Sequence, residues 1–458
     1  MSAGRFVSPD AIRTRFSQAM SEMYRAEVPQ YGTLLQIVGA VNARILAENP
    51  AFAAALARSD NLDRISLERH GAIRLGTSAE LSGMRRLFAV MGMHPVGYYD
   101  LSVAGVPVHS TAFRPITEAS LARNPFRVFT SLLRLELIEE PGLRQAAEEL
   151  LARRRIFTEG AWRLIARAEQ EGGLIEPEAE QFVTEAIETF RWQSTASVDA
   201  VLYARLHEAH RLIADVVCFR GPHINHLTPR TLDIDRVQKM MPQHGLAAKA
   251  VIEGPPRRAC PLLLRQTSFL ALEEPILFPG ADGALVAGTH TARFGEIEQR
   301  GMALTRAGRA LYDRLLAAAR DDPSAFTAFP DDEETIRAER LGFFRYSLAR
   351  PAAPDEIAAC GASLARLIEA GILQATPLIY EDFLPVSAAG IFQSNLGGTE
   401  LRSYAGQSMR GRFEEDLGAP VLDEFALYEE MERATLLSAF TSLGLDPEQI
   451  QAAVAPPR

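Results

Sequence analysis

One order of elements is predicted twice along this chain: a strand, a helix and then several strands. The first copy begins with the strand-like segment ISLERHGAIRL. Residues 78–93 follow with the apolar spacing of a helix, for which Ser78 is the expected N-cap. Residues 96–103 and 106–116 are extended. An alternation of this kind excludes a fold built from helices alone.

The second copy begins with HINHLTP and continues through a predicted helix at residues 233–241. Three further segments with strand character come after this helix, at residues 247–254, 261–272 and 292–305. The repeat lies in the order of elements rather than in the residues themselves. It predicts two related strand-rich modules.

Helical periodicity dominates the remainder of the chain, as in residues 9–58, 118–217, 308–319 and 363–371. We therefore predict an α+β fold in which helical segments surround and separate the two modules. The expected parts are an N-terminal helical segment 1–60, a first strand-rich metal-site module 61–117, a helical insert 118–217, a second strand-rich metal-site module 218–305 and a C-terminal mixed segment 306–458.

Composition narrows the class of protein. With 47% hydrophobic and 23% charged residues, the 458-residue chain has the composition of a globular protein. A net charge of −10 with scattered Lys and Arg argues against nucleic acid as a partner. We expect no membrane partner, because the longest uncharged run, residues 383–399, is rich in Gly, Ser, Gln and Asn. The amino terminus has no apolar stretch typical of a secretory signal, and the three cysteines form no CxxC pair, so we expect a cytoplasmic location.

Common catalytic signatures are absent: the sequence has no Walker loop, GxGxxG, GxSxG or HExxH motif. The segment His207-Glu208-Ala209-His210 is one residue short of the zincin pattern, and we interpret it as a solvated helix face. The search for chemistry is thereby reduced to histidines and carboxylates outside these motifs.

The first strand of each module carries a histidine, His70 and His226. Because side chains alternate along a strand, Arg74 is expected on the same side as His70. By the same alternation, Glu296 and Glu298 share a side, and either of them is a candidate. Two histidines and one carboxylate form the facial triad that leaves open positions on Fe(II). Spacing alone does not select this set over the remaining histidines, which include His94, His109, His223, His244 and His290.

Four long segments carry a more specific signal: LERHGAIRLGT, PHINHLTPRTLDID, ARFGEIEQRG and FLPVSAAGIFQSNLG. With them, over nearly its whole length, the chain resembles the 2-oxoadipate dioxygenase/decarboxylase family, also called hydroxyglutarate synthases. That family is similar to the vicinal oxygen chelate superfamily. The resemblance implies βαβββ modules that form a barrel-like sheet, and Fe(2+) as the cofactor.

The resemblance also implies roles for individual residues. His70 and His226 match the two imidazole ligands, and Glu296 matches the carboxylate ligand. The choice of Glu296 over Glu298 depends on a likeness to 4-hydroxyphenylpyruvate dioxygenase, whose ligand glutamate precedes Ile, one further residue and Gln-Arg. Arg74 resembles the arginine that binds a substrate carboxylate. We expect the remaining contacts to the substrate from Val386 and Ser387, which match a loop over the substrate, and from Gln266.

The implied reaction converts 2-oxoadipate and O2 into 2-hydroxyglutarate and CO2, in lysine catabolism. Such an enzyme is an oxidoreductase that places both oxygen atoms in one donor. Arg74 is expected to bind one carboxylate of the substrate through its forked guanidinium. Which end of the substrate it binds stays open.

Two alternatives come from other classes of protein. One is a metal-dependent isomerase or lyase of the glyoxalase type, which would consume no dioxygen. The other is a non-catalytic binding protein, which would hold no metal stoichiometrically. The sequence does not indicate an oligomeric state.

Overall fold

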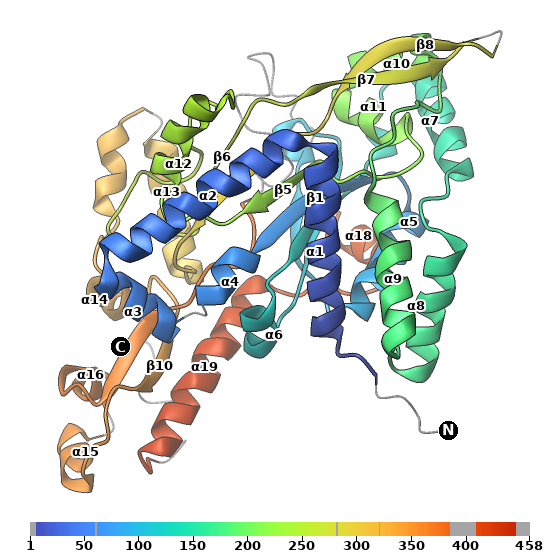
Figure 1. The fold of residues 1–458 in the computed structure, drawn as a ribbon. Coiled ribbons are helices and arrows are strands. Elements are labelled where there is room, and N and C mark those ends of the chain that lie inside the picture. The colour runs from blue at the N-terminus through green and yellow to red at the C-terminus, as the bar shows by residue number, and fades with distance from the viewer. Residues whose placement is uncertain are drawn as a thin grey trace. The chain divides into compact units, whose positions relative to one another are not determined.

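The computed structural model describes residues 6–59, 62–280, 283–319, 321–361, 363–384 and 409–445. Helices and strands are both abundant, which confirms the predicted α+β class (Figure 1). The chain divides into two compact units. Unit 1 comprises residues 1–253, 266–299 and 382–422, and unit 2 comprises residues 254–265, 300–381 and 423–458.

Unit 1 is built around a five-stranded sheet with the order β2-β3-β4-β1-β5. β1 pairs in parallel with β4 and antiparallel with β5, and the other neighbours are antiparallel. In chain order, β1, helix α5, β2, β3 and β4 form the βαβββ order that was expected of the first module. The strands are β1 (Arg69–Leu75), β2 (His94–Asp100), β3 (Val108–Arg114), β4 (Arg127–Leu133) and β5 (His226–Pro229).

The structure corrects three details of the sequence analysis. The segment 118–217 is not entirely helical, because it includes β4. All seven residues of β4 are buried, so the strand shows no alternation of apolar and polar residues. The five-stranded sheet is open in the part of the chain that the structure describes, whereas a barrel-like sheet was expected. Residues 247–254 make single bridges instead of a strand, and the prolines that follow at 255 and 256 lack the N–H that a ladder requires.

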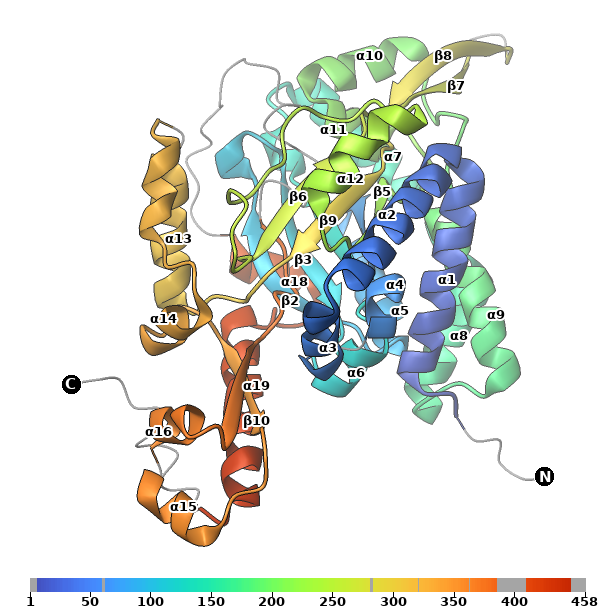
Figure 2. The same cartoon turned by 60° about the vertical axis from the view of Figure 1, so that its left-hand side comes forward.

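Helices cover the sheet of unit 1, and α1, α9 and α8 stand side by side in both views (Figures 1 and 2). Helix α5 begins after Thr77, not after the predicted N-cap Ser78, because the Thr77 hydroxyl accepts from the Glu80 N–H at 3.2 Å. The α-helices of unit 1 are α1 (Pro9–Glu27), α2 (Pro29–Glu48), α3 (Pro50–Ser59), α4 (Leu62–Leu67), α5 (Ser78–Val90), α6 (Glu118–Arg123), α7 (Pro141–Arg153), α8 (Glu159–Glu171), α9 (Glu176–Ile187), α10 (Ala200–Ala209), α11 (Arg211–Val217), α12 (Ile234–Met240) and α18 (Arg410–Leu417). Short 3-10 turns are η1 (Ser102–Ala104), η2 (Leu135–Leu137), η3 (Glu188–Phe190) and η4 (Met241–His244).

The second strand-rich segment supplies two pairs of strands. β6 (Leu264–Ser268) pairs with β9 (Glu296–Arg300), and β7 (Glu273–Pro279) pairs with β8 (Leu285–Thr291) (Figure 2). These strands belong to unit 1, except for residues 264–265 and 300. The pair of β6 and β9 brings Gln266 and Glu296 together, as described below.

Unit 2 contains an antiparallel pair of strands, β10 (Phe344–Leu348) and β11 (Leu373–Pro377), against which helix α19 (Glu424–Ser442) packs. Its other helices are α13 (Arg306–Ala318), η5 (Pro323–Ala328), α14 (Glu333–Ala338), α15 (Pro354–Cys360) and α16 (Leu364–Glu369). Throughout the described ranges, no helix combines the length and the apolar character that crossing a membrane requires.

Candidate metal centre

His70, His226 and Glu296 meet in the interior of unit 1. One ligand atom from each lies within 4.8 Å of the others, and all three side chains are fully buried. In the pairing of β1 with β5, Ala72 lies opposite His226 and His70 lies opposite Thr228. The two histidines are therefore diagonal neighbours on one face of the sheet. β9 supplies the glutamate, so the three predicted ligands come from three different strands.

Only one of the two carboxylate oxygens of Glu296 is hydrogen-bonded. Oε1 lies 3.0 Å from His70 Nε2 and accepts from Thr228 Oγ1 at 3.0 Å and from Gln266 Nε2 at 2.8 Å. The Thr228 hydroxyl also lies 3.0 Å from Nδ1 of His226, which links the second histidine to the same oxygen. These contacts fix the glutamate and leave Oε2 without a partner.

Three buried polar atoms at this place have neither a hydrogen bond nor an ion pair, namely His226 Nε2, Glu296 Oε2 and Gln266 Oε1, whereas His70 Nδ1 has its ion pair with Glu298. A buried polar atom without a partner typically costs about 1–3 kcal/mol, so such atoms are rarely gathered without a reason. Two of them are a nitrogen and an oxygen of the facial-triad type, which binds non-heme Fe(II). The donor set therefore fits a divalent cation.

Burial shifts the pKa values of two of the three side chains toward their neutral forms. Burial raises the pKa of Glu296, and the hydrogen bond and charge of His70 only partly oppose this. Burial, together with the charges of His70 and Arg74, holds the pKa of His226 well below its ordinary value. His226 is therefore a neutral imidazole, which is the form that binds a metal.

Glu298 lies on the other side of the His70 ring from Glu296. Its Oε2 is 3.0 Å from His70 Nδ1, whereas Glu296 contacts Nε2. Burial lowers the pKa of His70, but the charge of Glu298 and the hydrogen bonds of both glutamates outweigh it and raise that pKa. A carboxylate behind a ligating histidine orients the ring and increases its basicity. From the sequence, Glu298 was expected only as a rival ligand to Glu296; its role behind His70 was missed, although the two glutamates are two residues apart on one predicted strand.

Aromatic rings enclose the histidines. The ring of Phe383 lies 4.9 Å from that of His70 in an edge-on arrangement, and Phe294 stacks on His226 at 4.9 Å. Phe129 contacts Phe383 in turn, at 5.3 Å. This apolar wall keeps water from the ligand atoms.

Arg74 is buried in unit 1, and its guanidinium is paired. Its Nη1 donates to Asp215 Oδ2 at 2.5 Å. Arg74 follows His70 by four residues on β1, and its charge contributes to the lowered pKa of His226. Sequence reasoning missed Asp215, which comes from α11 and belongs to no recognisable motif.

A second set of two histidines and one carboxylate is formed by Asp215, His223 and His290. The atoms that face one another in this set are already engaged, and only His223 Nδ1 has no hydrogen bond: Asp215 Oδ1 lies 2.9 Å from His290 Nε2 and 3.2 Å from His223 Nε2, and Nδ1 of His290 lies 2.7 Å from the Tyr203 hydroxyl. The neighbouring guanidinium of Arg74 would also repel a cation. Of the two sets, the one in which both a histidine nitrogen and a carboxylate oxygen lack a partner is the candidate metal centre.

The other predicted substrate contacts are only partly visible. Gln266 lies beside Glu296, within the buried cluster. Val386 and Ser387 lie outside the described residues. The rival histidines His94, His109 and His244 belong to neither set of possible ligands in the described part of the chain.

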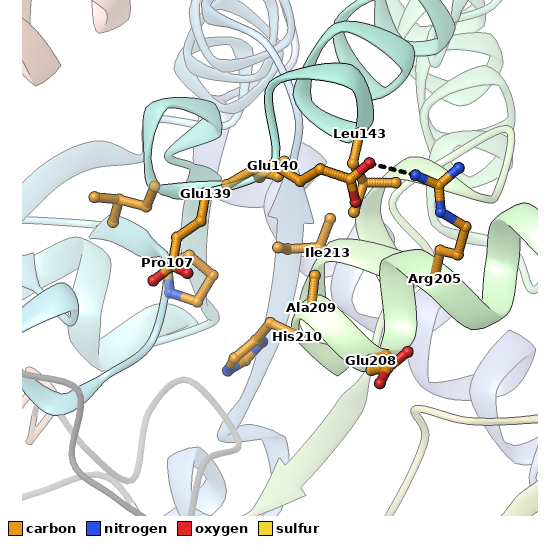
Figure 3. A pocket seen from close by; sticks show the side chains of 11 residues that line it. Pro107, Glu139, Glu140, Leu143, Arg205, Glu208, Ala209, His210 and Ile213 are labelled. Carbon is orange, nitrogen blue, oxygen red and sulfur yellow. Dashed lines mark hydrogen bonds and ion pairs between the residues drawn. The ribbon is translucent and has the colours of Figure 1, made fainter.

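A cavity of about 300 Å³ lies elsewhere in unit 1 (Figure 3). Glu140 and Arg205 form an ion pair at its edge, and His210 and Glu208 also line it. Helix α10 ends at Ala209, so His210 does not continue the helix face that carries the exposed His207 and Glu208. The lining residues include none of the three candidate ligands, and we assign no function to this cavity.

Comparison with known proteins gives consistent matches over almost the whole chain. The family model described as 2-oxoadipate dioxygenase/decarboxylase matches residues 16–395. A 2-oxoadipate dioxygenase/decarboxylase of Escherichia coli is 58% identical over 438 residues, which cover 93% of this chain and 97% of the relative. The crystal structure of the hydroxyglutarate synthase from Pseudomonas putida in complex with 2-oxoadipate is 51% identical, with a TM-score of 0.87, and covers 97% of this chain and 100% of that one.

Proposed function

The chain belongs to the 2-oxoadipate dioxygenase/decarboxylase family, as its four long segments indicated, and we propose that it is an Fe(II)-dependent enzyme acting on 2-oxoadipate. The proposed reaction consumes one 2-oxoadipate and one O2 and yields one 2-hydroxyglutarate and one CO2, which balances all atoms. The buried cluster of His70, His226 and Glu296, with its unpaired ligand atoms, is the observation that carries this proposal.

His70, His226 and Glu296 would hold the metal. When bound there, Fe(II) would supply open positions for a chelating 2-oxo acid and for dioxygen. The protein's part is to fix the ligands before the substrate arrives. Thr228 holds both His226 and Glu296, and Glu298 holds His70 from behind.

Arg74 is the proposed partner of a substrate carboxylate. It stands four residues from His70 on the same face of β1, roughly 13 Å away between Cα atoms at the usual rise of a strand. 2-Oxoadipate has a carboxylate at each end, so one end can lie at the metal while the other reaches the guanidinium. Forked N–H donors suit a carboxylate better than a point charge does.

Water exclusion is the third contribution of the chain. Phe383 and Phe294 pack directly on the ligating rings. A dry pocket strengthens the electrostatic contacts within it and protects reactive species from side reactions.

We also place the reaction in the cytoplasm, since the three cysteines are all free, and in lysine catabolism, as the family resemblance implies.

The test is oxygen uptake by the full-length protein loaded with Fe(II) under anaerobic conditions and then given 2-oxoadipate in aerated buffer. We expect O2 consumption, CO2 release and 2-hydroxyglutarate formation in equal amounts. His226→Ala, purified and loaded in the same way, should bind less iron and lose turnover. Metal binding without O2 consumption would refute the proposal in favour of an isomerase or lyase, and the absence of stoichiometric metal would refute any metalloenzyme.

A further inference from the structure

We propose that Asp215 is a positioning residue for Arg74, held in place by His223 and His290. The inference deepens the proposed function and rests on it, because it assumes that Arg74 binds a substrate carboxylate. Asp215, His223 and His290 therefore form not a second metal site but a support that aims the guanidinium.

Both oxygens of Asp215 are used, and they are used for different purposes. Oδ2 accepts from Arg74 Nη1 at 2.5 Å. Oδ1 receives the two imidazoles, with His290 Nε2 at 2.9 Å and His223 Nε2 at 3.2 Å. One oxygen therefore fixes the carboxylate in the protein, and the other fixes the arginine. All four side chains are buried, so water offers no competing partner.

The two histidines are themselves immobilised. His290 Nδ1 lies 2.7 Å from the hydroxyl of Tyr203, on α10. The indole of Trp192 packs edge-on against His223 at 4.7 Å and lies parallel to His290 at 6.1 Å. These contacts come from separate parts of unit 1 and hold the two histidines against Asp215, on the side opposite its bond to Arg74.

Charge gives the carboxylate a second purpose. Burial lowers the pKa of Arg211, the charge of Arg74 lowers it further and the charge of Asp215 raises it. The charge of Asp215 therefore offsets the repulsion between the two guanidinium groups. Without its charge, we expect Arg74 to leave the orientation in which its fork meets a carboxylate.

The experiment compares Asp215→Asn with the wild type as the Fe(II)-loaded, full-length enzyme. Asn has the same shape but no charge. We expect the KM for 2-oxoadipate to rise roughly 10- to 100-fold, which is the usual range for the loss of a charge-assisted hydrogen bond. We expect kcat to stay within about threefold and the iron content to stay at one per chain, because the metal ligands are untouched.

A second substrate separates positioning from general damage. 2-Oxohexanoate lacks the distal carboxylate, so its KM should be nearly the same in the wild type and in Asp215→Asn. The matched control is Asp10→Asn, which removes the carboxylate paired at 2.7 Å with another fully buried arginine, Arg13. This control should lower the melting temperature without changing either KM. His290→Phe keeps the ring against Trp192 but loses the bond to Asp215, and it carries the test if Asp215→Asn does not fold.

An unchanged KM for 2-oxoadipate in a folded Asp215→Asn or His290→Phe enzyme would overturn the inference. So would a wild type with two metal ions per chain, one of which is lost in Asp215→Asn. If the wild type itself does not turn over 2-oxoadipate, the proposed function and this inference fail together. If the wild type is active and the variants have an unchanged KM for 2-oxoadipate, this inference is refuted and the proposed function stands.

Discussion

Replacing Glu296 with Gln tests the metal centre without relying on catalysis. Gln keeps the shape of the side chain and an acceptor oxygen for the three donors that surround Oε1. Burial raises the pKa of Glu296 above its ordinary value of 4.5, with partial opposition from His70. The unfolded chain therefore loses this proton at lower pH than the folded protein does, and folding becomes less favourable as the pH rises from about 4.5 to the raised pKa. At pH 7.5, metal-free Glu296→Gln should melt at or above the temperature of the metal-free wild type.

Bound metal should reverse the order of the two melting temperatures, so that the wild type melts above Glu296→Gln. A cation at 100 times its dissociation constant stabilises the folded state by about 2.7 kcal/mol. Unit 1 has roughly 330 residues, and an unfolding entropy of about 2.1 cal/mol/K per residue gives about 0.7 kcal/mol/K. The wild type should therefore melt about 4 °C higher with metal. Glu296→Gln, without its anionic ligand, should shift by less than about 1 °C.

The assay is anaerobic scanning calorimetry of both proteins with and without Fe(II), with Mn(II) as a probe that resists oxidation. Glu298→Gln is the matched control, because it changes the carboxylate behind His70 instead of the proposed ligand. Loss of such support commonly weakens metal binding 10- to 100-fold, which leaves a shift of about 0.6–2 °C at the same metal concentration. A full 4 °C shift in Glu296→Gln would show that this carboxylate is not a ligand.

Three further variants test other parts of the structure. Arg74→Lys keeps the charge but loses the fork, so the KM for 2-oxoadipate should rise about tenfold or more while iron still binds, and an unchanged KM would exclude Arg74 as the carboxylate partner. Burial, assisted by Arg134, lowers the pKa of His109 from 6.5 to about 4, so folding stability should fall by up to about 3 kcal/mol as the pH drops through that interval. In denaturant titrations, His109→Gln should reduce the loss of unfolding free energy between pH 6.5 and 4, whereas His244→Gln, at an exposed position, should not. If both variants lose as much unfolding free energy over this pH range as the wild type, His109 is not the group responsible. A Cβ on Gly71 would lie 2.6 Å from Ile224 Cδ1 and 2.9 Å from the His226 carbonyl oxygen, so Gly71→Ala should displace β5 and weaken metal binding. A Cβ on Gly39 would meet nothing within 4 Å, so Gly39→Ala should leave metal binding unchanged.

The sequence predicted the candidate ligands where a strand-like pattern of residues and the family resemblance pointed to the same segment. β1, β5 and β9 were expected as strands, and their candidate ligands meet in the structure. β4 was missed because a strand buried on both faces has no alternation to detect. Asp215 was missed for a different reason: it meets Arg74 only through the tertiary arrangement of α11 and β1, which no spacing in the chain encodes.

The pairing of β1 with β5 completes the five-stranded sheet and brings the two candidate histidine ligands together in the same step. β5 follows β1 in the chain only after β2, β3, β4 and helices α5 to α11, yet it lies next to β1 in the sheet. A contact between strands so far apart in the chain forms late, because the entropy cost of closing the long intervening loop comes before the stabilising contacts are made. A register slip of one residue would turn His226 to the opposite face, away from His70. Iron capture during refolding should therefore report both this pairing and the placement of β9, which carries Glu296, and a nascent chain should be unable to take up the metal until both strands are in place.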